Sequence, residues 1–186
     1  MNKPPAFATV DPVKGMNNNS PARCQNLVSG EWRNDESEYA KIPDPLTGED
    51  FLLVPNTSDT AEFIKNLSNC PKSGLHNPIK NVERYVMLGD VCAKSAELMR
   101  NPEIELFFAR MIQRVMPKSI NQCIGEVRVT RVFLENFAGD GVRFLARGFS
   151  NPGDHNGQES NGYRWPFGSV VIIAPFNFPL EIPVLQ

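Results

Sequence analysis

The chain has 186 residues, 41% of them hydrophobic, and its 19 basic and 21 acidic residues give a formal net charge of -2. This length is sufficient for one domain with a hydrophobic core, and the near-zero charge argues against a general binder of nucleic acid or of anionic membranes. No apolar run approaches the roughly 20 residues that a helix needs to span a membrane.

The N-terminus is expected to be a flexible tail. Residues 1–23 are rich in Pro and Asn and show no hydrophobic periodicity. Residues 1–20 contain Lys3 and Lys14 as their only basic side chains and have no long apolar core. The sequence therefore predicts neither a secretory signal nor an Arg-rich targeting leader, and residues 24–186 are expected to be the folded part.

Two short segments predict β-strands. Residues 25–32 are one strand candidate, and residues 51–54 are another, ended by Pro55. Between them, residues 44–49 contain the Pro and Gly that are typical of a turn.

Two helices are expected next, because apolar residues recur every three or four positions. The first begins at a cap, Ser58 or Asp59, and reaches residue 69, and a loop at residues 70–78 separates it from the second, at residues 82–100. The inward-facing positions are Phe63, Ile64 and Leu67 in the first helix and Tyr85, Leu88, Cys92, Ala96 and Met99 in the second.

Two further helices follow. The third begins at Asn101 with Pro102 in its first turn and runs to about residue 116. The fourth begins at Ser119, is expected to be the longest, and ends near Gly139. Its inward side is expected to consist of Ile120, Cys123, Ile124, Val127, Phe133 and Phe137.

A hairpin and then a buried strand are predicted after these helices. Residues 150–162 are rich in Gly, Asn and Asp and are expected to form the loop of the hairpin, with residues 162–166 as its return strand. The apolar run at residues 169–174 predicts a strand buried on both faces, and residues 180–186 predict the entry of a helix. Helices followed by one buried strand predict an α/β sheet whose remaining strands lie beyond Gln186.

Asn177 lies between this strand and the helix, flanked by Phe176 and Phe178. Ligands of open α/β sheets bind at the carboxyl ends of strands, and a neutral amide there can donate a hydrogen bond to an oxygen that gains negative charge. The alternative is that Asn177 caps the helix, because Asn is a preferred cap and Pro179 suits a first turn. The two roles are compatible. Phe176 and Phe178 either frame a substrate or flat cofactor ring or pack in the core.

Arg110, Arg114 and Lys118 are spaced four residues apart near the end of the third helix. This row is either an anion site or a solvated face that complements the helix dipole, and the second interpretation is the simpler one.

No metal site is expected. The cysteines and histidines are Cys24, Cys70, Cys92, Cys123, His76 and His155. Their spacing is not that of a zinc site, the thiols are expected to be reduced, and Cys123 is expected to pack among apolar neighbours. The sequence also contains no Gly-rich phosphate motif and no evident Ser/His/Asp arrangement.

The Pro-Phe-Asn-Phe-Pro segment at residues 175–179 resembles the aldehyde dehydrogenase superfamily, in which a strand ending in Pro-aromatic-Asn-Phe precedes a helix. Residues 28–32 and 44–49 are similar to the opening strands of that superfamily. A narrower similarity is to the plant-type delta-1-pyrroline-5-carboxylate dehydrogenases, also called glutamate-semialdehyde dehydrogenases. The similar segments are residues 7–11, 70–78, 107–119, 133–137, 143–147 and 162–166.

The resemblance implies a fold. It is the N-terminal, largely helical portion of an aldehyde-dehydrogenase-type NAD-binding α/β domain, with the first strand of an incomplete parallel sheet. Residues 148–166 are implied to contain part of a β-hairpin oligomerisation arm.

The resemblance also implies an activity, the NAD-dependent oxidation of L-glutamate γ-semialdehyde to glutamate in proline catabolism. In the family a cysteine thiolate adds to the aldehyde, hydride passes to NAD, and water assisted by a glutamate hydrolyses the thioester. Asn177 is implied to stabilise the oxyanion, and Phe178 to pack beside the carbon chain of the substrate. The residues implied to lie against the nicotinamide half of NAD are Ile173, Ala174, Pro175 and Phe176.

The same resemblance implies a small aldehyde as the substrate and a homo-oligomer at full length. It also implies the mitochondrial matrix as the location, with the cytoplasm as the alternative because no leader is visible. Segments like the family's adenosine-binding segments, nucleophilic cysteine and general-base glutamate are not found in these 186 residues, so the chain alone is expected to be inactive. Two other interpretations are a non-catalytic product that associates with full-length subunits and an aldehyde dehydrogenase of another substrate class.

Overall fold

The computed structural model describes residues 8–34, 37–69, 82–164, 167 and 169–186. In chain order the elements are β1 (Ala22–Arg23), β2 (Asn26–Val28), β3 (Glu31–Arg33), β4 (Tyr39–Pro43), β5 (Asp50–Pro55), α1 (Ala61–Ser68), α2 (Val82–Met99), α3 (Pro102–Val115), α4 (Ile120–Asn136), α5 (Asp140–Ala146), β6 (Phe149–Pro152), β7 (Glu159–Gly162) and α6 (Glu181–Leu185). The expected loop at residues 70–78, with Cys70 and His76, lies outside the described residues, as do Trp165 and Pro166.

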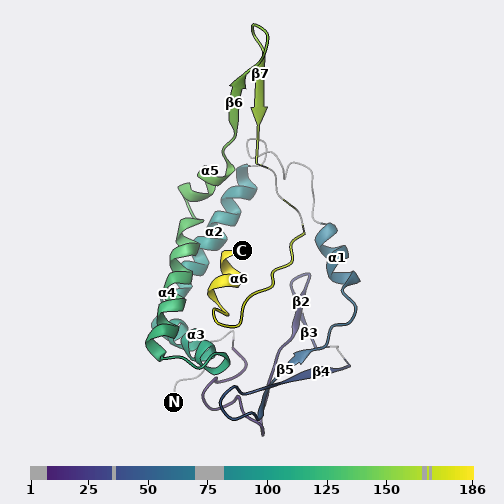
Figure 1. The fold of residues 1–186 in the computed structure, drawn as a ribbon, viewed down its shortest axis with the longest axis vertical. Coiled ribbons are helices and arrows are strands. Elements are labelled where there is room, and N and C mark those ends of the chain that lie inside the picture. Colours follow the sequence, from purple (N-terminus) through teal and green to yellow (C-terminus); the bar gives the residue numbers. More distant parts are fainter. Residues whose placement is uncertain (1–7, 35–36, 70–81, 165–166, 168) are drawn as a thin grey trace.

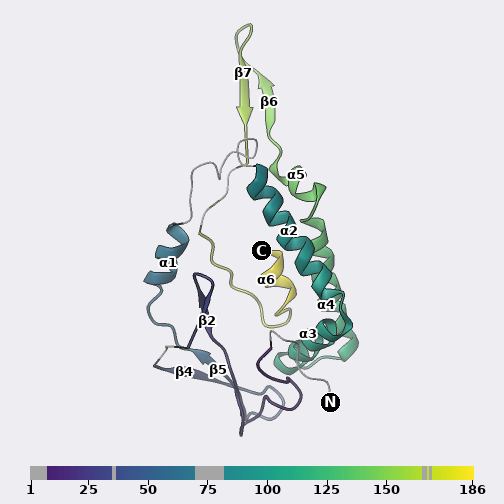
Figure 2. The same cartoon turned by 180° about the vertical axis from the view of Figure 1, so that it is seen from behind.

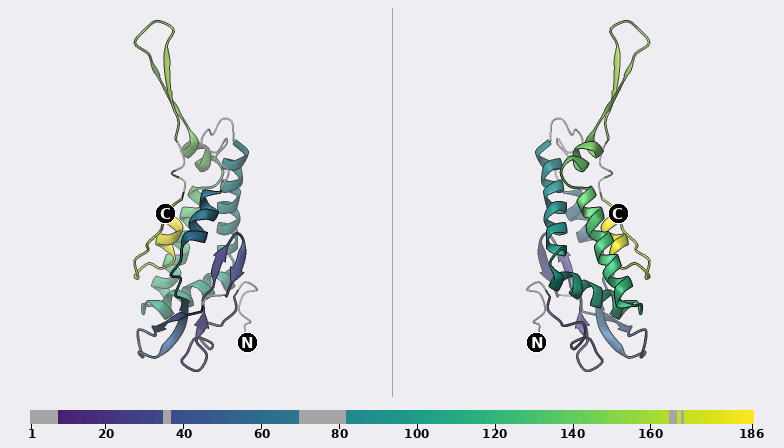
Figure 3. Two further views of the ribbon diagram at one scale, coloured as in Figure 1. Left: turned by 90° about the vertical axis from the view of Figure 1, so that its right-hand side faces the viewer. Right: turned by 90° about the vertical axis from the view of Figure 1, so that its left-hand side faces the viewer.

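The longer helices and the sheets that contain β2 to β5 lie on opposite sides of the molecule, as Figure 1 and the reverse view in Figure 2 show. In Figure 1, α2 and α4 run along one side with α5 above and α3 below them, and β2 to β5 occupy the lower part of the other side. The segment before α6 crosses between the two sides, and α6 packs against α4. The β6–β7 hairpin projects away from the rest of the molecule (Figure 3).

The N-terminal residues are attached to a three-stranded sheet of order β1-β5-β4. β4 is antiparallel to β5, and β1 is parallel to it with Ala22 opposite Leu52. Met16 is only 2% exposed and packs with Ala22 and Phe51 in a small core. Residues 8–23 therefore differ from the expected flexible tail, because strand pairing and apolar burial hold them against β5.

The strand expected at residues 25–32 is two strands, β2 and β3, paired antiparallel. Ser29 and Gly30 connect them, with φ angles of 53° and 84°. Two consecutive residues with positive φ are typical of the tight turn whose twist matches the flanking strands. The prediction of one strand was wrong because Ser-Gly is itself a turn signal.

The turn and the strand expected after this hairpin are confirmed. The Gly48 N–H donates to the Asp44 carbonyl at 2.8 Å, and the Asp44 N–H donates to the Glu49 carbonyl at 2.7 Å, so residues 44–49 close a loop between β4 and β5. β5 contains the whole predicted strand at residues 51–54.

The starts of α3 and α4 confirm the helix signals in the sequence. The Asn101 side chain accepts a hydrogen bond from the Glu103 N–H at 2.9 Å, and Pro102 is the first helical residue. Ser119 and Gln122 form a reciprocal capping box at the start of α4. α4 has 17 residues and α2 has 18, so α4 is not the longest of the described helices.

The main apolar core of the described residues lies between α3 and α4. Its buried members are Ala109, Ile112, Cys123 and Val127. Leu180, just before α6, packs against this core together with Phe108, Ile120 and Ile124. The inward side predicted for α4 is thus confirmed at Cys123 and Val127, and Phe133 and Phe137 are partly buried.

The apolar face of α1, which its sequence pattern predicts to be buried, is not buried in the structure. Ile64 and Leu67 are exposed, Phe63 is half-buried, and the helix has no buried residue. Asp59 accepts a backbone hydrogen bond at the start of the helix, although Thr60 occupies the cap position. An amphipathic pattern shows which face can be buried, but the rest of the fold decides whether anything covers it.

α2 has nearly the predicted bounds and part of the predicted inward face. Ala96 and Met99 are buried and Cys92 is half-buried, whereas Leu88 is exposed. The Tyr85 side chain lies outside the described part of the structure.

The buried strand expected at residues 169–174 is not observed. The segment has no strand assignment, and Val171 and Ile173 are 85% and 90% exposed. A strand requires a neighbour for its backbone hydrogen bonds and, to be buried, a layer on each face. None of the described strands pairs with this segment, which therefore stays extended and exposed.

The hairpin predicted near residue 150 is present, but its strands are placed differently. β6 and β7 pair from Phe149 opposite Gly162 to Pro152 opposite Glu159, so the loop is residues 153–158. The return strand therefore ends where the sequence predicted it to begin. The Gly/Asn/Asp-rich residues form part of the strands because backbone pairing requires no apolar side chains.

Arg114 joins α3 to the sheet. Its guanidinium group lies 2.8 Å from the carboxylate of the buried Asp44 and donates to the Met16 carbonyl at 2.6 Å. The guanidinium carbon also lies 5.1 Å from the centre of the Phe51 ring. One side chain at the end of α3 thus contacts the N-terminal segment, the β4–β5 turn and the sheet.

Replacement of Arg114 with Met is expected to lower the free energy of unfolding by about 3 kcal/mol, because the buried Asp44 loses its cationic partner. Urea unfolding at pH 7, followed by circular dichroism, measures this change. The control is Lys94→Met, which removes an exposed ion pair with Glu97 and is expected to cost less than about 1 kcal/mol. Equal losses in the two variants would contradict a joining role for Arg114.

Candidate active site

Asn177 lies in a series of turns, residues 176–180, that leads from the extended segment into α6. It does not cap this helix, because the cap position is Leu180 and α6 begins at Glu181. The capping alternative is therefore wrong, and the Asn177 residue is exposed at the surface.

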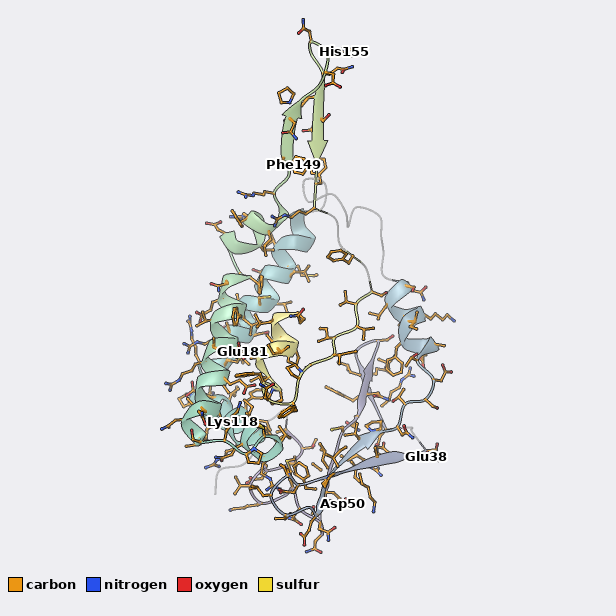
Figure 4. The ribbon with its side chains drawn as sticks, viewed as in Figure 1. Glu38, Asp50, Lys118, Phe149, His155 and Glu181 are labelled. Carbon is orange, nitrogen blue, oxygen red and sulfur yellow. The ribbon has the colours of Figure 1, made fainter. Side chains whose placement is uncertain are left out.

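Lys118 lies in the short connection between α3 and α4, near Glu181 of α6 (Figure 4). Its Nζ atom lies 2.6 Å from Glu126 Oε2 and donates to the Asn177 carbonyl at 2.9 Å. The same atom lies 4.8 Å from the centre of the Phe178 ring, within the range of a cation–π contact. The ammonium group is thus held between a carboxylate, a backbone carbonyl and an aromatic ring.

Glu126 of α4 completes this arrangement. Its side chain is 1% exposed, and its Oε1 atom accepts hydrogen bonds from the Leu180 N–H at 2.9 Å and the Glu181 N–H at 3.3 Å. α6 has no side-chain cap of its own, so a carboxylate from another helix accepts from the N–H groups at its start. The Lys118–Glu126 pair therefore holds the backbone on the carboxyl side of Asn177 against α4.

The structure brings only some of the predicted site residues together. Phe178 lies beside Lys118 and Asn177, and it is 41% exposed. Ile173, Ala174, Pro175 and Phe176 are all exposed. The interpretation of Phe176 as a core residue is not supported, because its side chain does not pack in the interior.

The row of basic residues does not form one face. α3 ends at Val115, so Lys118 lies beyond the helix. Arg114 turns toward Asp44 and Lys118 toward Glu126, and only Arg110 is exposed. Neither an anion site nor a fully solvated face describes these residues, because two of the three side chains are in ion pairs with buried carboxylates.

Glu126 was not identified from the sequence, although a signal was present. It lies three residues after Cys123 and directly before Val127, on the side of the helix that the apolar pattern turns inward. Thr130, four residues further on, is also buried, and its hydroxyl donates to the Glu126 carbonyl at 2.7 Å. A carboxylate at a predicted core position requires buried partners, which indicates a contact with another segment.

The cysteines of the described residues show no sign of a nucleophile beside Asn177. Cys123 is fully buried in the core beneath Leu180, and burial raises the pKa of its thiol, which disfavours the reactive thiolate. Cys24 is exposed on the sheet side, and Cys92 is half-buried in α2.

Among the described residues, no three His, Cys, Asp or Glu side chains come together in a group that could hold a metal ion. Among the described helices, none combines the length and apolar character that crossing a membrane requires.

The sequence matches one protein family and two plant proteins along most of its length. The profile of the family described as "Aldehyde dehydrogenase family" matches residues 32–186. A probable aldehyde dehydrogenase of Linum usitatissimum is 54% identical over 97% of this chain and 33% of its own length. Delta-1-pyrroline-5-carboxylate dehydrogenase 12A1, mitochondrial, of Arabidopsis thaliana is also 54% identical, over 97% of this chain and 32% of its own length. The chain thus spans about a third of the length of the curated relatives it matches.

Solved structures share the fold. A putative methylmalonate-semialdehyde dehydrogenase from Sinorhizobium meliloti, complexed with NAD, has a TM-score of 0.68 at 21% identity and covers 88% of this chain and 32% of its own. An NADP-dependent glyceraldehyde-3-phosphate dehydrogenase from Bacillus halodurans, complexed with NADP, has a TM-score of 0.63 at 24% identity and covers 87% of this chain and 34% of its own.

The burial of Cys123 predicts that its thiol reacts slowly with alkylating reagents. With iodoacetamide at pH 7.5, Cys123 is expected to react at least about 100-fold more slowly in the folded chain than in urea, because both access and thiolate formation are suppressed. Cys24 is the internal comparison. Burial raises the pKa of this thiol as well, but its exposure permits attack. Mass spectrometry of the labelled peptides measures both rates, and equal rates in the folded chain would contradict the packing of Cys123.

Proposed function

Because the chain belongs to the aldehyde dehydrogenase family, we propose that it forms part of an enzyme that oxidises L-glutamate γ-semialdehyde to glutamate with NAD. The support for this substrate is the similarity, along nearly the whole chain, to a plant delta-1-pyrroline-5-carboxylate dehydrogenase. Delta-1-pyrroline-5-carboxylate is the cyclic form of L-glutamate γ-semialdehyde. This oxidation is the second step of proline catabolism.

The main structural support for the proposal is the position of Asn177. The residue is exposed, and hydrogen bonds to Lys118 and Glu126 hold the backbone of the turn that contains it. When a thiolate adds to the aldehyde carbon, the carbonyl electron pair moves to the oxygen, which becomes negative. The Asn177 amide can donate a hydrogen bond to that oxygen without transferring a proton. A donor held in place for an oxyanion is worth about 10²–10³ in kcat.

The residues before Asn177 fit the nicotinamide half of NAD. Residues 173–175 and the first turn residue, Phe176, are exposed and apolar, and their backbone is not paired with any described strand. A flat ring can pack on such side chains while its carboxamide bonds to the backbone groups. When bound, NAD accepts the hydride from the substrate. We propose NAD as this cofactor because the resemblance to the plant-type delta-1-pyrroline-5-carboxylate dehydrogenases implies it; solved structures of the same fold hold NAD or NADP.

Phe178 is proposed to pack beside the carbon chain of the substrate. Its ring is partly exposed and one contact of the ring is with the Lys118 ammonium, so the remaining surface is open to an aliphatic chain. The mitochondrial matrix is proposed as the location, because the Arabidopsis relative is described as mitochondrial.

The β6–β7 hairpin is proposed to be an oligomerisation arm. It projects from the molecule and exposes nearly all of its residues, including Phe149 (Figure 3). A two-stranded hairpin is marginally stable by itself, so a partner sheet that pairs with an edge would stabilise it.

The role of Asn177 can be tested in a chimera in which these 186 residues replace the matching third of the Arabidopsis enzyme. Asn177→Ala is expected to lower kcat about 100-fold or more while the KM for NAD stays within about twofold, because the lost hydrogen bond acts on the transition state. Initial rates of NADH formation with the semialdehyde measure both parameters.

The matched control is Asn121→Ala, which removes an exposed amide from the first turn of α4. Its kcat is expected to equal that of the unsubstituted chimera. The proposed function is wrong if the unsubstituted chimera folds but does not oxidise the semialdehyde, and the role of Asn177 is wrong if both Asn variants behave alike.

The 186-residue chain alone is expected to show no NAD-dependent oxidation of the semialdehyde. No cysteine of the described residues lies exposed next to Asn177, so the addition step has no thiolate at that place. The same NADH assay, with the chain at micromolar concentration and the chimera as the positive control, measures this. Turnover by the chain alone would falsify the prediction.

A further inference from the structure

We propose that Lys118 and Glu126 are positioning residues for Asn177, holding the backbone of residues 177–181 so that the amide stands where the aldehyde oxygen is bound. This inference rests on the function proposed above. It assigns a role in the reaction to two residues that do not themselves touch the substrate.

Lys118 and Glu126 contact the chain at both ends of the turn. Lys118 binds the carbonyl of Asn177 itself, and Glu126 binds the N–H groups of Leu180 and Glu181. All three contacts are to backbone atoms, so they fix the path of the chain on both sides of the turn. They leave Asn177 at the surface, where its side chain is available to a ligand.

Among the described residues, few other contacts hold the turn. Residues 169–174 are not paired with any described strand, and α6 has five residues and no side-chain cap. Leu180 supplies the apolar contact with the α3–α4 core. The polar contacts that fix the orientation of the turn are therefore those of Lys118 and Glu126.

Both charged side chains are largely buried. The Glu126 side chain is 1% exposed and the Lys118 side chain 14% exposed, so each charge depends on the other and on the turn for its hydrogen bonds. A buried carboxylate that loses these partners carries an uncompensated desolvation cost. The turn is therefore held in one position relative to α4, because a shifted turn would take the N–H groups of Leu180 and Glu181 away from Glu126.

The chain offers a matched control. Glu105 of α3 and Arg128 of α4 form a two-bond ion pair at 2.9 and 3.0 Å, and this pair joins the two helices on either side of Lys118. Neither residue contacts residues 177–181 in any described interaction. A substitution in the Glu105–Arg128 pair therefore weakens the contact between α3 and α4 but leaves the hydrogen bonds of residues 177–181 in place.

The first experiment uses the 186-residue chain and requires no activity. Amide hydrogen exchange by NMR is expected to be at least about 10-fold faster at Leu180 in Glu126→Ala than in the unsubstituted chain, because that N–H loses its acceptor. Glu126→Gln keeps an acceptor oxygen and is expected to restore most of the protection. Glu105→Ala is expected to leave the exchange at Leu180 unchanged.

The second experiment is a double-substitution cycle in the chimera. Glu126→Ala is expected to lower kcat about 10- to 100-fold when Asn177 is present, because a displaced donor no longer reaches the oxyanion. In the Asn177→Ala background the same change is expected to alter kcat less than about twofold, because the two residues act as one unit. Glu126→Gln again gives a variant that folds if Glu126→Ala does not.

The outcomes separate the two proposals. Equal fold-changes in kcat in the two backgrounds mean a general structural role and overturn the inference, as does unchanged exchange at Leu180 in Glu126→Ala. A folded chimera without activity overturns the proposed function, while the exchange experiment still decides whether Glu126 holds the turn. Coupled kinetic effects, with faster exchange at Leu180, support the positioning role.

Discussion

The buried carboxylate of Glu126 is the constraint on which the C-terminal part of the structure depends. An ionised group with almost no solvent contact is tolerated only when all of its oxygen atoms have partners. One oxygen is paired with Lys118 and the other accepts two backbone N–H groups at the start of α6. The position of α6 against α4 and the course of the turn that carries Asn177 both follow from meeting this requirement.

The region where α3 ends connects parts of the chain that are distant in sequence. Arg114 attaches the helices to the N-terminal segment and the β4–β5 turn, and Lys118 attaches them to the turn at residues 176–180. The two basic residues are only four positions apart but face different carboxylates, because the helix ends between them. The sheet side and the candidate active site are therefore both held by the same end of α3.

The apolar segment that precedes Asn177 is exposed in the structure. Residues 169–176 have the composition of a buried strand, but none of the described strands pairs with them, and the chain covers about a third of the length of its relatives. In the proposed function this exposed segment leads directly to the amide that acts on the aldehyde oxygen. The same residues that would be costly on a free surface are suited to a nicotinamide ring and an aliphatic substrate.

Residue types alone were enough to predict the local features: the starts of α3 and α4 at Asn101 and Ser119, the turn at residues 44–49, and the presence of a hairpin near residue 150. These depend on interactions between residues close in the chain, such as a cap with the next N–H groups, and the residue types reveal them. Only the three-dimensional structure shows that Ala22–Arg23 joins a sheet, that residues 169–174 are not a strand, and that Glu126 and Lys118 hold the turn beside Asn177. Pairing, burial and ionic contact each need a partner from a distant segment, and a periodic pattern identifies a surface that can be covered without identifying what covers it.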